Sequence, residues 1–181
     1  MYFFIFFLSF LFLSTNPISG ENSSRQISTI SEDQYCAFCD PQVLLRQTFY
    51  EGDLVRALCT HKPIYPGHCL VIPKRHVERF EDLTAEEITE IGITIQKVDQ
   101  AVKKVFHTGP YLLLQKNGKE VGQTVPHVHF HYIPRKEGDD STIMFLVRMF
   151  GLSLLSPISA QEIEKNVTSL RSAMEDSTLL H

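Results

Sequence analysis

The chain has 181 residues, of which 43% are hydrophobic and 21% are charged, and its formal net charge is -4. This length allows one domain with a well-buried core plus tails. The composition is ordinary for a soluble protein, and the slightly acidic balance excludes the basic footprint by which proteins bind duplex nucleic acid.

Residues 1–20 differ in kind from the rest of the chain. From Tyr2 to Leu13 only Ser9 is not apolar, which fits the apolar core of a secretory signal, whereas a membrane-spanning helix needs about 20 apolar residues. The first basic side chain is Arg25, so the basic stretch that normally opens a signal is missing. Three interpretations stay open: an export signal, a short membrane anchor, or a start codon placed too far upstream. The first two predict an exported or membrane-associated protein, and the third a cytoplasmic one.

The rest of the chain divides by pattern into three parts. Residues 21–34 are polar and are interpreted as a linker. Residues 35–136 carry the dense alternation of apolar runs and turns expected of a folded domain. Residues 137–181 are expected to form a C-terminal part, with an unusually apolar segment at 142–155 and a helix after it.

Two cysteines open the folded part. Cys36 and Cys39 are separated by two residues, a spacing typical of half a zinc site or of a redox dithiol. The βαβ pattern that favours a redox pair does not follow. Zinc needs two further ligands, for which His76 and one histidine of a later cluster are candidates. In an exported chain these thiols could instead form a disulfide with each other, or with Cys59 or Cys69.

The domain contains five predicted strands. They are expected as a hairpin at 48–60, which holds two of them, and as single strands at 67–73, 111–115 and 125–133. Two helices accompany them. The combination predicts an α+β fold with an antiparallel sheet of about five strands, one long helix and a C-terminal helix.

The long helix is predicted at 82–106, where Thr84 and Glu87 match a capping box. Its apolar residues recur at helical spacing and are expected to face the core. They are Ile88, Ile91, Ile95, Val98, Val102 and Val105. The second helix is predicted near 160–174, with Ser159 capping its first turn.

The stretch TVPHVHFHYIP, residues 124–134, has a histidine at every second position: His127, His129 and His131. Alternate side chains of a strand share a face, so all three imidazoles are expected on one face. A regular strand would separate the outer two by roughly 13 Å. Metal–nitrogen bonds are only about 2 Å long, so one ion for all three is not expected. The three histidines are predicted to have different tasks.

The glycine-rich loop at 116–123 leads directly into these histidines. Gly118 and Gly122 allow backbone conformations that expose N–H groups, which suits an anion, and Gln123 and Thr124 add polar side chains. A histidine is partly neutral at neutral pH and can attack phosphorus, while a flanking imidazole assists and backbone amides stabilise the charged oxygens. The combination predicts a phosphate site.

The motif GQTVPHVHFHYIPR closely resembles the signature of the histidine triad (HIT) superfamily. The similarity runs from about Cys36 to Arg135, through PIYPGHCLVIPKRHVERFEDLT and NGKEVGQTVP. The resemblance implies a HIT-like fold whose sheet extends across a homodimer. It also implies a nucleotidyl hydrolase or transferase that acts on a purine nucleotide or nucleotide conjugate, a phosphoramidate or a dinucleoside polyphosphate, through a covalent histidine–nucleotidyl intermediate.

The same resemblance assigns residues. It implies that His129 is the catalytic nucleophile and that His131 is its catalytic partner at the phosphate. Substrate contacts are expected from His68, Thr60, Lys116, Asn117, Gly122, Gln123 and Thr124. The zinc-bearing branch of the family implies a structural Zn²⁺ held by Cys36, Cys39, His76 and His127.

Two positions depart from the family pattern. Thr60 stands where Asp or Asn commonly binds the ribose, so base and sugar preference stay open. Lys116 stands where the family usually has Asn or Gln, with Asn117 beside it. Either Lys116 faces the site and favours polyphosphate substrates, or Asn117, shifted by one place, takes the usual role.

Two other functions stay open from the sequence. One is a non-catalytic nucleotide-binding or scaffolding HIT module, in which residues 142–155 dock a partner. The other is a redox or disulfide protein that uses Cys36 and Cys39. The complete triad favours the enzyme, because a pure binding module has no need of a nucleophile.

Overall fold

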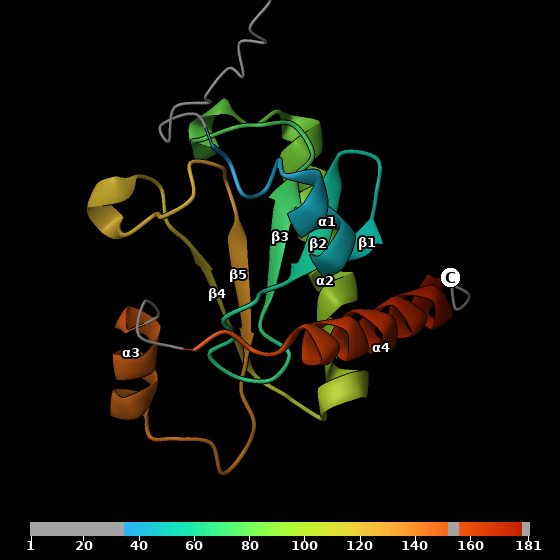
Figure 1. Ribbon diagram of the computed structural model, residues 1–181, viewed down its shortest axis with the longest axis vertical. Helices are drawn as coiled ribbons and strands as arrows, with labels where there is room; N and C mark the ends of the chain where they lie inside the picture. Colours follow the sequence, from blue (N-terminus) through green and yellow to red (C-terminus); the bar gives the residue numbers. More distant parts are fainter. Residues whose placement is uncertain (1–34, 152–155, 179–181) are drawn as a thin grey trace, which may run out of the picture. The chain divides into compact units, whose positions relative to one another are not determined.

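Figure 1 shows the computed structural model, which describes residues 35–151 and 156–178. These residues contain a five-stranded sheet of order β1-β2-β3-β5-β4, in which every neighbouring pair is antiparallel. The strands are β1 (Thr48–Glu51), β2 (Val55–Cys59), β3 (Cys69–Pro73), β4 (Tyr111–Gln115) and β5 (Phe130–Pro134). The predicted α+β fold is confirmed, while the predicted leader and linker at 1–34 lie outside the described residues.

Four α-helices accompany the sheet in the described part of the chain. They are α1 (Pro41–Gln47), α2 (Ala85–Phe106), α3 (Thr142–Phe150) and α4 (Ala160–Thr178). α2 and α4 confirm the two predicted helices, and Ser159 Oγ accepts from Glu162 N–H at 3.2 Å at the start of α4. α1 was not predicted, because its seven residues are too short for a periodic pattern. It begins at Asp40, whose carboxylate accepts from Gln42 N–H, with Pro41 in the first turn.

The predicted capping box of α2 is present in both directions. Glu87 N–H donates to Thr84 Oγ1 at 3.2 Å, and Thr84 N–H donates to the Glu87 carboxylate at 2.9 Å. The predicted apolar stripe needs one correction, since the side chain of Ile88 is 42% exposed. Glu87 is buried beside it, and its carboxylate is neutralised by the guanidinium of Arg75 at 2.8 Å.

The two faces of the sheet bury different clusters. One face packs against α2 and α4, which contribute Val98, Val102, Val167 and Leu170 to the main core. The opposite face has Leu58, Leu70 and Ile72 beneath Cys36 and Phe38. Farther along that opposite face, Ile133 of β5 packs with Ile64 and with Phe145 of α3.

The histidine segment is only partly a strand, so the prediction of a strand over 125–133 was wrong at its beginning. β5 starts at Phe130, and the residues before it bond elsewhere: Val128 N–H donates to Val77 O at 2.6 Å, outside the sheet. The alternation nevertheless holds. Val128 and Tyr132 lie in the core beside α2, and Leu70 pairs with His131 on the opposite face.

The apolar segment predicted at 142–155 contains α3, while residues 152–155 lie outside the described residues. Phe145 of α3 is buried and Met149 is partly buried beside it, but five other large apolar residues of α3 are at least 42% exposed. They are Ile143, Met144, Leu146, Val147 and Phe150. Within the described ranges, no helix combines the length and the apolar character needed to cross a membrane.

Candidate active site and metal site

The imidazole of His129 has one tautomer. Its Nδ1 lies 2.7 Å from the carbonyl oxygen of His127. Because a carbonyl oxygen only accepts, Nδ1 carries the proton, and Nε2 keeps its lone pair. His129 is only 4% exposed, and this burial lowers the pKa of its imidazole. The ring is therefore neutral at neutral pH. A neutral imidazole with a free Nε2 is a nucleophile.

His68 and His131 form a hydrogen-bonded pair in which each ring also has one tautomer. Ile64 N–H donates to His68 Nδ1 at 3.1 Å, so the proton of neutral His68 is on Nε2. That Nε2 lies 3.0 Å from His131 Nδ1 and donates to it. The proton of His131 is then on its own Nε2. Burial lowers the pKa of both rings, so both are neutral at neutral pH.

His129 lies next to the His68–His131 pair. The ring centroids of His129 and His131 are 4.9 Å apart, with the ring planes at 70°. The structure therefore brings a nucleophilic nitrogen beside a neutral N–H donor, as expected for the two predicted catalytic histidines. His68, predicted as a substrate contact, instead touches His131 and sets which of its nitrogens carries the proton.

Both glycines of the glycine-rich loop use the conformational freedom that was expected of them, since φ is 125° at Gly118 and 83° at Gly122. Two N–H groups are bonded within the loop, contrary to the expectation that they are exposed. Gly122 N–H donates to Lys119 O and Gln123 N–H donates to Gly118 O, which leaves neither to a phosphate. Among the described residues, the N–H groups of Thr124 and Val125 have no internal acceptor. The N–H groups left available to an anion in this stretch are therefore two and three positions after the predicted Gly122.

The side chain of Gln123, expected at the phosphate, holds the loop together. Its Oε1 accepts from Gly118 N–H at 2.7 Å. Its Nε2 donates to the carbonyl oxygens of Glu78 and Val125, at 3.0 and 3.1 Å. Gln123 is only 8% exposed, so it is a scaffold for the histidine segment.

Asn117 and Thr60 are likewise occupied within the protein. Asn117 Oδ1 accepts from Phe80 N–H and its Nδ2 donates to the Glu81 carboxylate, both at 2.8 Å. Thr60 Oγ1 accepts from Lys62 N–H at 3.4 Å in a turn. In the described part of the chain neither side chain contacts a histidine, so the structure brings neither to the catalytic pair.

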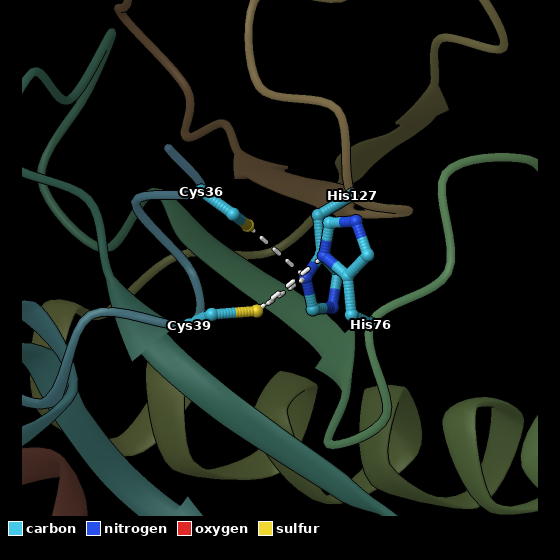
Figure 2. Close-up of side chains that lie close together, drawn as sticks. All are labelled: Cys36, Cys39, His76 and His127. Atoms are coloured by element: carbon cyan, nitrogen blue, oxygen red, sulfur yellow. Dashed lines mark hydrogen bonds between the residues drawn. The ribbon is translucent and has the colours of Figure 1, made fainter. Parts of the chain in front are cut away.

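The four predicted metal ligands lie together, and Figure 2 shows their side chains converging from three segments of the chain. Their ligand atoms all lie within 4.8 Å of one another. Cys36 Sγ is 3.5 Å and Cys39 Sγ 3.7 Å from His127 Nδ1, and Cys39 Sγ is 3.4 Å from His76 Nδ1. All four cysteines of the chain are free thiols.

The cluster passes a test of fit for zinc. Zinc bonds of about 2.0–2.3 Å in a tetrahedron put its ligand atoms about 3.4–3.8 Å apart, the range of the three measured separations. His127 Nε2 lies 3.0 Å from Pro73 O and donates to it, which leaves the lone pair on Nδ1, the atom that faces the thiols. Burial raises the pKa of Cys36 to about 11, and a divalent cation would hold this thiol as the thiolate.

Phe38 is a site residue that sequence reasoning missed. Its ring packs edge-on against both His127 and His129, with centroids 5.8 and 5.2 Å away. It therefore contacts one residue of the metal cluster and one of the catalytic pair. Its place inside the Cys-x-x-Cys spacing is the one sequence signal that could have identified it.

Known proteins are similar to this chain in sequence and fold. Residues 43–138 match the HIT domain family. A bis(5'-adenosyl)-triphosphatase of Dictyostelium discoideum is 38% identical over 136 residues, which cover 74% of this chain and 91% of the relative. An asymmetrical bis(5'-nucleosyl)-tetraphosphatase of Schizosaccharomyces pombe is 47% identical over 95 residues, and the match spans only about half of each protein, 52% of this chain and 52% of the relative.

One solved structure bears on the metal cluster. A Zn-bound histidine triad family protein from Mycobacterium smegmatis superimposes with a TM-score of 0.59 at 25% identity, covering 74% of this chain and 87% of that protein. The domain match covers more than half of the chain, and the Dictyostelium relative is covered almost completely. This chain therefore belongs to the HIT family.

Proposed function

We propose that the chain is a HIT hydrolase that cleaves dinucleoside polyphosphates through transfer of the nucleotidyl group to His129. The observation that carries this proposal is the fixed tautomer of His129, whose Nδ1–H is bound and whose Nε2 is free, beside the N–H donor of His131. The relatives from Dictyostelium and Schizosaccharomyces are named for hydrolysis of such substrates, which supports the same substrate class.

In the first step His129 Nε2 attacks the α-phosphorus. A bond forms between Nε2 and phosphorus, and the bond from phosphorus to the bridging oxygen breaks, so that its electron pair leaves on the departing phosphate chain. The ring becomes positively charged, and the His127 carbonyl, still bound to Nδ1–H, stabilises this charge. His131 Nε2–H donates to an oxygen of the substrate, and the Thr124 and Val125 amides donate to the non-bridging oxygens.

In the second step water attacks the same phosphorus. The phosphorus–nitrogen bond breaks, and its electron pair returns to His129 Nε2. The water gives up one proton to solvent, and the nucleoside monophosphate leaves. The first step needs His129 neutral at the start, which its burial favours, and the second step regenerates the neutral ring.

We also propose that zinc occupies the cluster of Cys36, Cys39, His76 and His127. The separations of the ligand atoms and the bound Nε2 of His127 support this metal, as does the Zn-bound relative. The ion would cross-link the segment before α1, the turn after β3 and the segment before β5. Its role is structural, because the ligands form a closed set of four.

We further propose a homodimer that forms along β4. β4 lies at the edge of the sheet, and its side chains Tyr111 and Leu113 are 44% and 42% exposed. An exposed, apolar edge strand can pair with another chain, which would extend the sheet.

The nucleophile assignment is tested by His129→Ala. Because only the attacking nitrogen is removed, we expect kcat for a bis(5'-adenosyl) triphosphate to fall by more than about 10³-fold, while nucleotide affinity changes by less than about threefold. His107→Asn is the matched control, since His107 ends α2 in a left-handed conformation that Asn tolerates. Turnover of His129→Ala within threefold of wild type would refute the role. Binding without any wild-type turnover would favour the non-catalytic module instead.

The metal proposal is tested by elemental analysis of the purified full chain. We expect about one zinc per chain, and we expect a chelator to lower the melting temperature, because a structural zinc site contributes directly to folding. Cys39→Ser should lose the metal, whereas Cys59→Ala, outside the cluster, should keep it. Metal-free protein whose melting temperature the chelator leaves unchanged would contradict the proposal.

The homodimer is tested by light scattering at micromolar concentration. We expect a dimer for the wild type and a monomer for Leu113→Glu, because a charge on the edge strand opposes pairing. Leu45→Glu is the control, since Leu45 is 76% exposed on α1, away from β4. A monomeric wild type would show that the sheet does not extend across two chains.

The neutral His68–His131 pair predicts how stability depends on pH. Burial lowers both pKa values below the unfolded value of about 6.5, so below that pH the unfolded chain binds more protons than the folded chain. The contribution of the neutral His68–His131 pair to the free energy of unfolding is therefore complete above about pH 7. It is lost as the pH falls below about 6.5. In urea titrations from pH 7 to 5, His131→Asn should reduce the slope of the unfolding free energy by up to about 1.4 kcal/mol per pH unit. An unchanged slope would mean that His131 is not held neutral.

A further inference from the structure

Among residues 35–151 and 156–178, Lys116 is the charged side chain that lies beside the catalytic histidines without an ion-pair partner. It follows β4 directly, and its side chain folds over the turn that leads into the histidine segment. A Cβ added to Gly122 would lie 3.5 Å from Lys116 Nζ and 3.9 Å from Lys116 Cδ. The positive charge of Lys116 is also among the causes, after burial and the neighbouring histidines, that lower the pKa of His131. Its ammonium therefore lies on the histidine side of the loop.

This cation is not neutralised by the protein. Within the described ranges no carboxylate oxygen lies within 4.0 Å of Lys116 Nζ. Other lysines are paired, such as Lys74 with Glu51 at 2.9 Å and Lys103 with Asp99 at 2.7 Å. The neighbouring imidazole rings of His129 and His131 carry no negative charge that could compensate it. A half-buried, unpaired ammonium beside neutral donors is suited to a ligand that brings its own negative charge.

The neighbouring amide cannot take this place. Both ends of the Asn117 side chain are used, Oδ1 by Phe80 N–H and Nδ2 by the Glu81 carboxylate. These bonds, with Arg79 next to Glu81, lower the pKa of Glu81 to about 2, so its carboxylate stays charged and keeps Asn117 turned toward the 80–81 turn. Of the two alternatives that the sequence left open, the structure favours Lys116.

We propose that Lys116 is a specificity-determining residue that binds the phosphate chain beyond the α-phosphate, so that the site selects substrates by the negative charge of the leaving group. This inference rests on the hydrolase function proposed above. When the bond from phosphorus to the bridging oxygen breaks, negative charge develops on the departing nucleoside phosphate. The ammonium of Lys116 stabilises that charge. A neutral amine that leaves from a phosphoramidate develops no such charge and gains nothing from the lysine.

The chemistry of the side chain matters to this selection. A lysine only donates hydrogen bonds and carries a full positive charge, whereas an Asn in its place both donates and accepts but is neutral. The contribution of Lys116 is therefore mainly electrostatic. It should weaken with added salt, because the Debye length falls from about 10 Å at 0.1 M to about 3 Å at 1 M.

The test compares two substrates on the full chain, a bis(5'-adenosyl) tetraphosphate and an adenosine phosphoramidate with a neutral leaving amine. We expect Lys116→Asn to lower kcat/KM for the tetraphosphate by about 10–100-fold, the range of a hydrogen bond to a charged group, and for the phosphoramidate by less than about threefold. Lys116→Arg should restore most of the loss, and 1 M salt should narrow the gap between wild type and Lys116→Asn. Lys119→Asn, an exposed lysine three residues farther along the same loop, is the matched control and should leave both substrates unchanged.

A second measurement does not depend on turnover. In the His129→Ala background, Lys116→Asn should weaken the binding of ATP by about tenfold more than the binding of AMP, because only ATP has phosphates beyond the first. Equal losses for both substrates or both nucleotides would overturn the proposal, and so would a silent Lys116→Asn alongside a damaging Asn117→Ala. Wild-type turnover of neither substrate would count against the hydrolase itself, whereas wild-type turnover without a charge preference would count against Lys116 alone.

Discussion

The site depends on His127, whose Nε2, Nδ1 and backbone carbonyl each contact a different part of the structure. Its Nε2 donates to Pro73 O at the end of β3, its Nδ1 faces the thiols of Cys36 and Cys39, and its carbonyl oxygen accepts from His129 Nδ1. The ring of His127 is thus part of the metal cluster, and its backbone carbonyl orients the proposed nucleophile His129. Anything that moves this residue disturbs both, so the proposed zinc ion would influence the position of His129 through His127.

Backbone carbonyl and amide groups set the protonation of the catalytic pair, and in the described residues no carboxylate pairs with His68, His129 or His131. A carboxylate beside these rings would favour the protonated imidazolium, which cannot attack phosphorus. Burial and neutral partners keep them as free bases instead. Among the described residues, the unpaired charge nearby is the ammonium of Lys116, which opposes protonation of His131 and which we propose attracts the polyphosphate. In the proposed function, the site therefore combines a neutral nucleophile with a cation that binds the charged part of its substrate.

Local signals in the sequence were sufficient for the five strands, for the two longest helices and for the grouping of the metal-ligand candidates, but not for α1 and α3. The capping box at Thr84 fixed the beginning of α2, and the spacing of Cys36, Cys39 and the later histidines identified a cluster that the fold brings together. The roles of polar loop residues could not be predicted, because their partners are distant in the chain. Asn117 binds Phe80 and Glu81, and Gln123 binds Glu78, across 36 to 45 positions. Likewise, the bond from Val128 to Val77, which delays the start of β5, has no local sequence signature.

The central claim is that His129 is a neutral imidazole with its proton on Nδ1 and a free Nε2. Nitrogen NMR of the full chain labelled at histidine, with His129 identified by the loss of its signals in His129→Ala, measures this directly. At neutral pH without substrate, the account predicts a protonated Nδ1 and an unprotonated Nε2 for this residue. A proton on Nε2, or a doubly protonated ring, would contradict it, because neither form leaves a lone pair on Nε2, the nitrogen assigned to the attack on phosphorus.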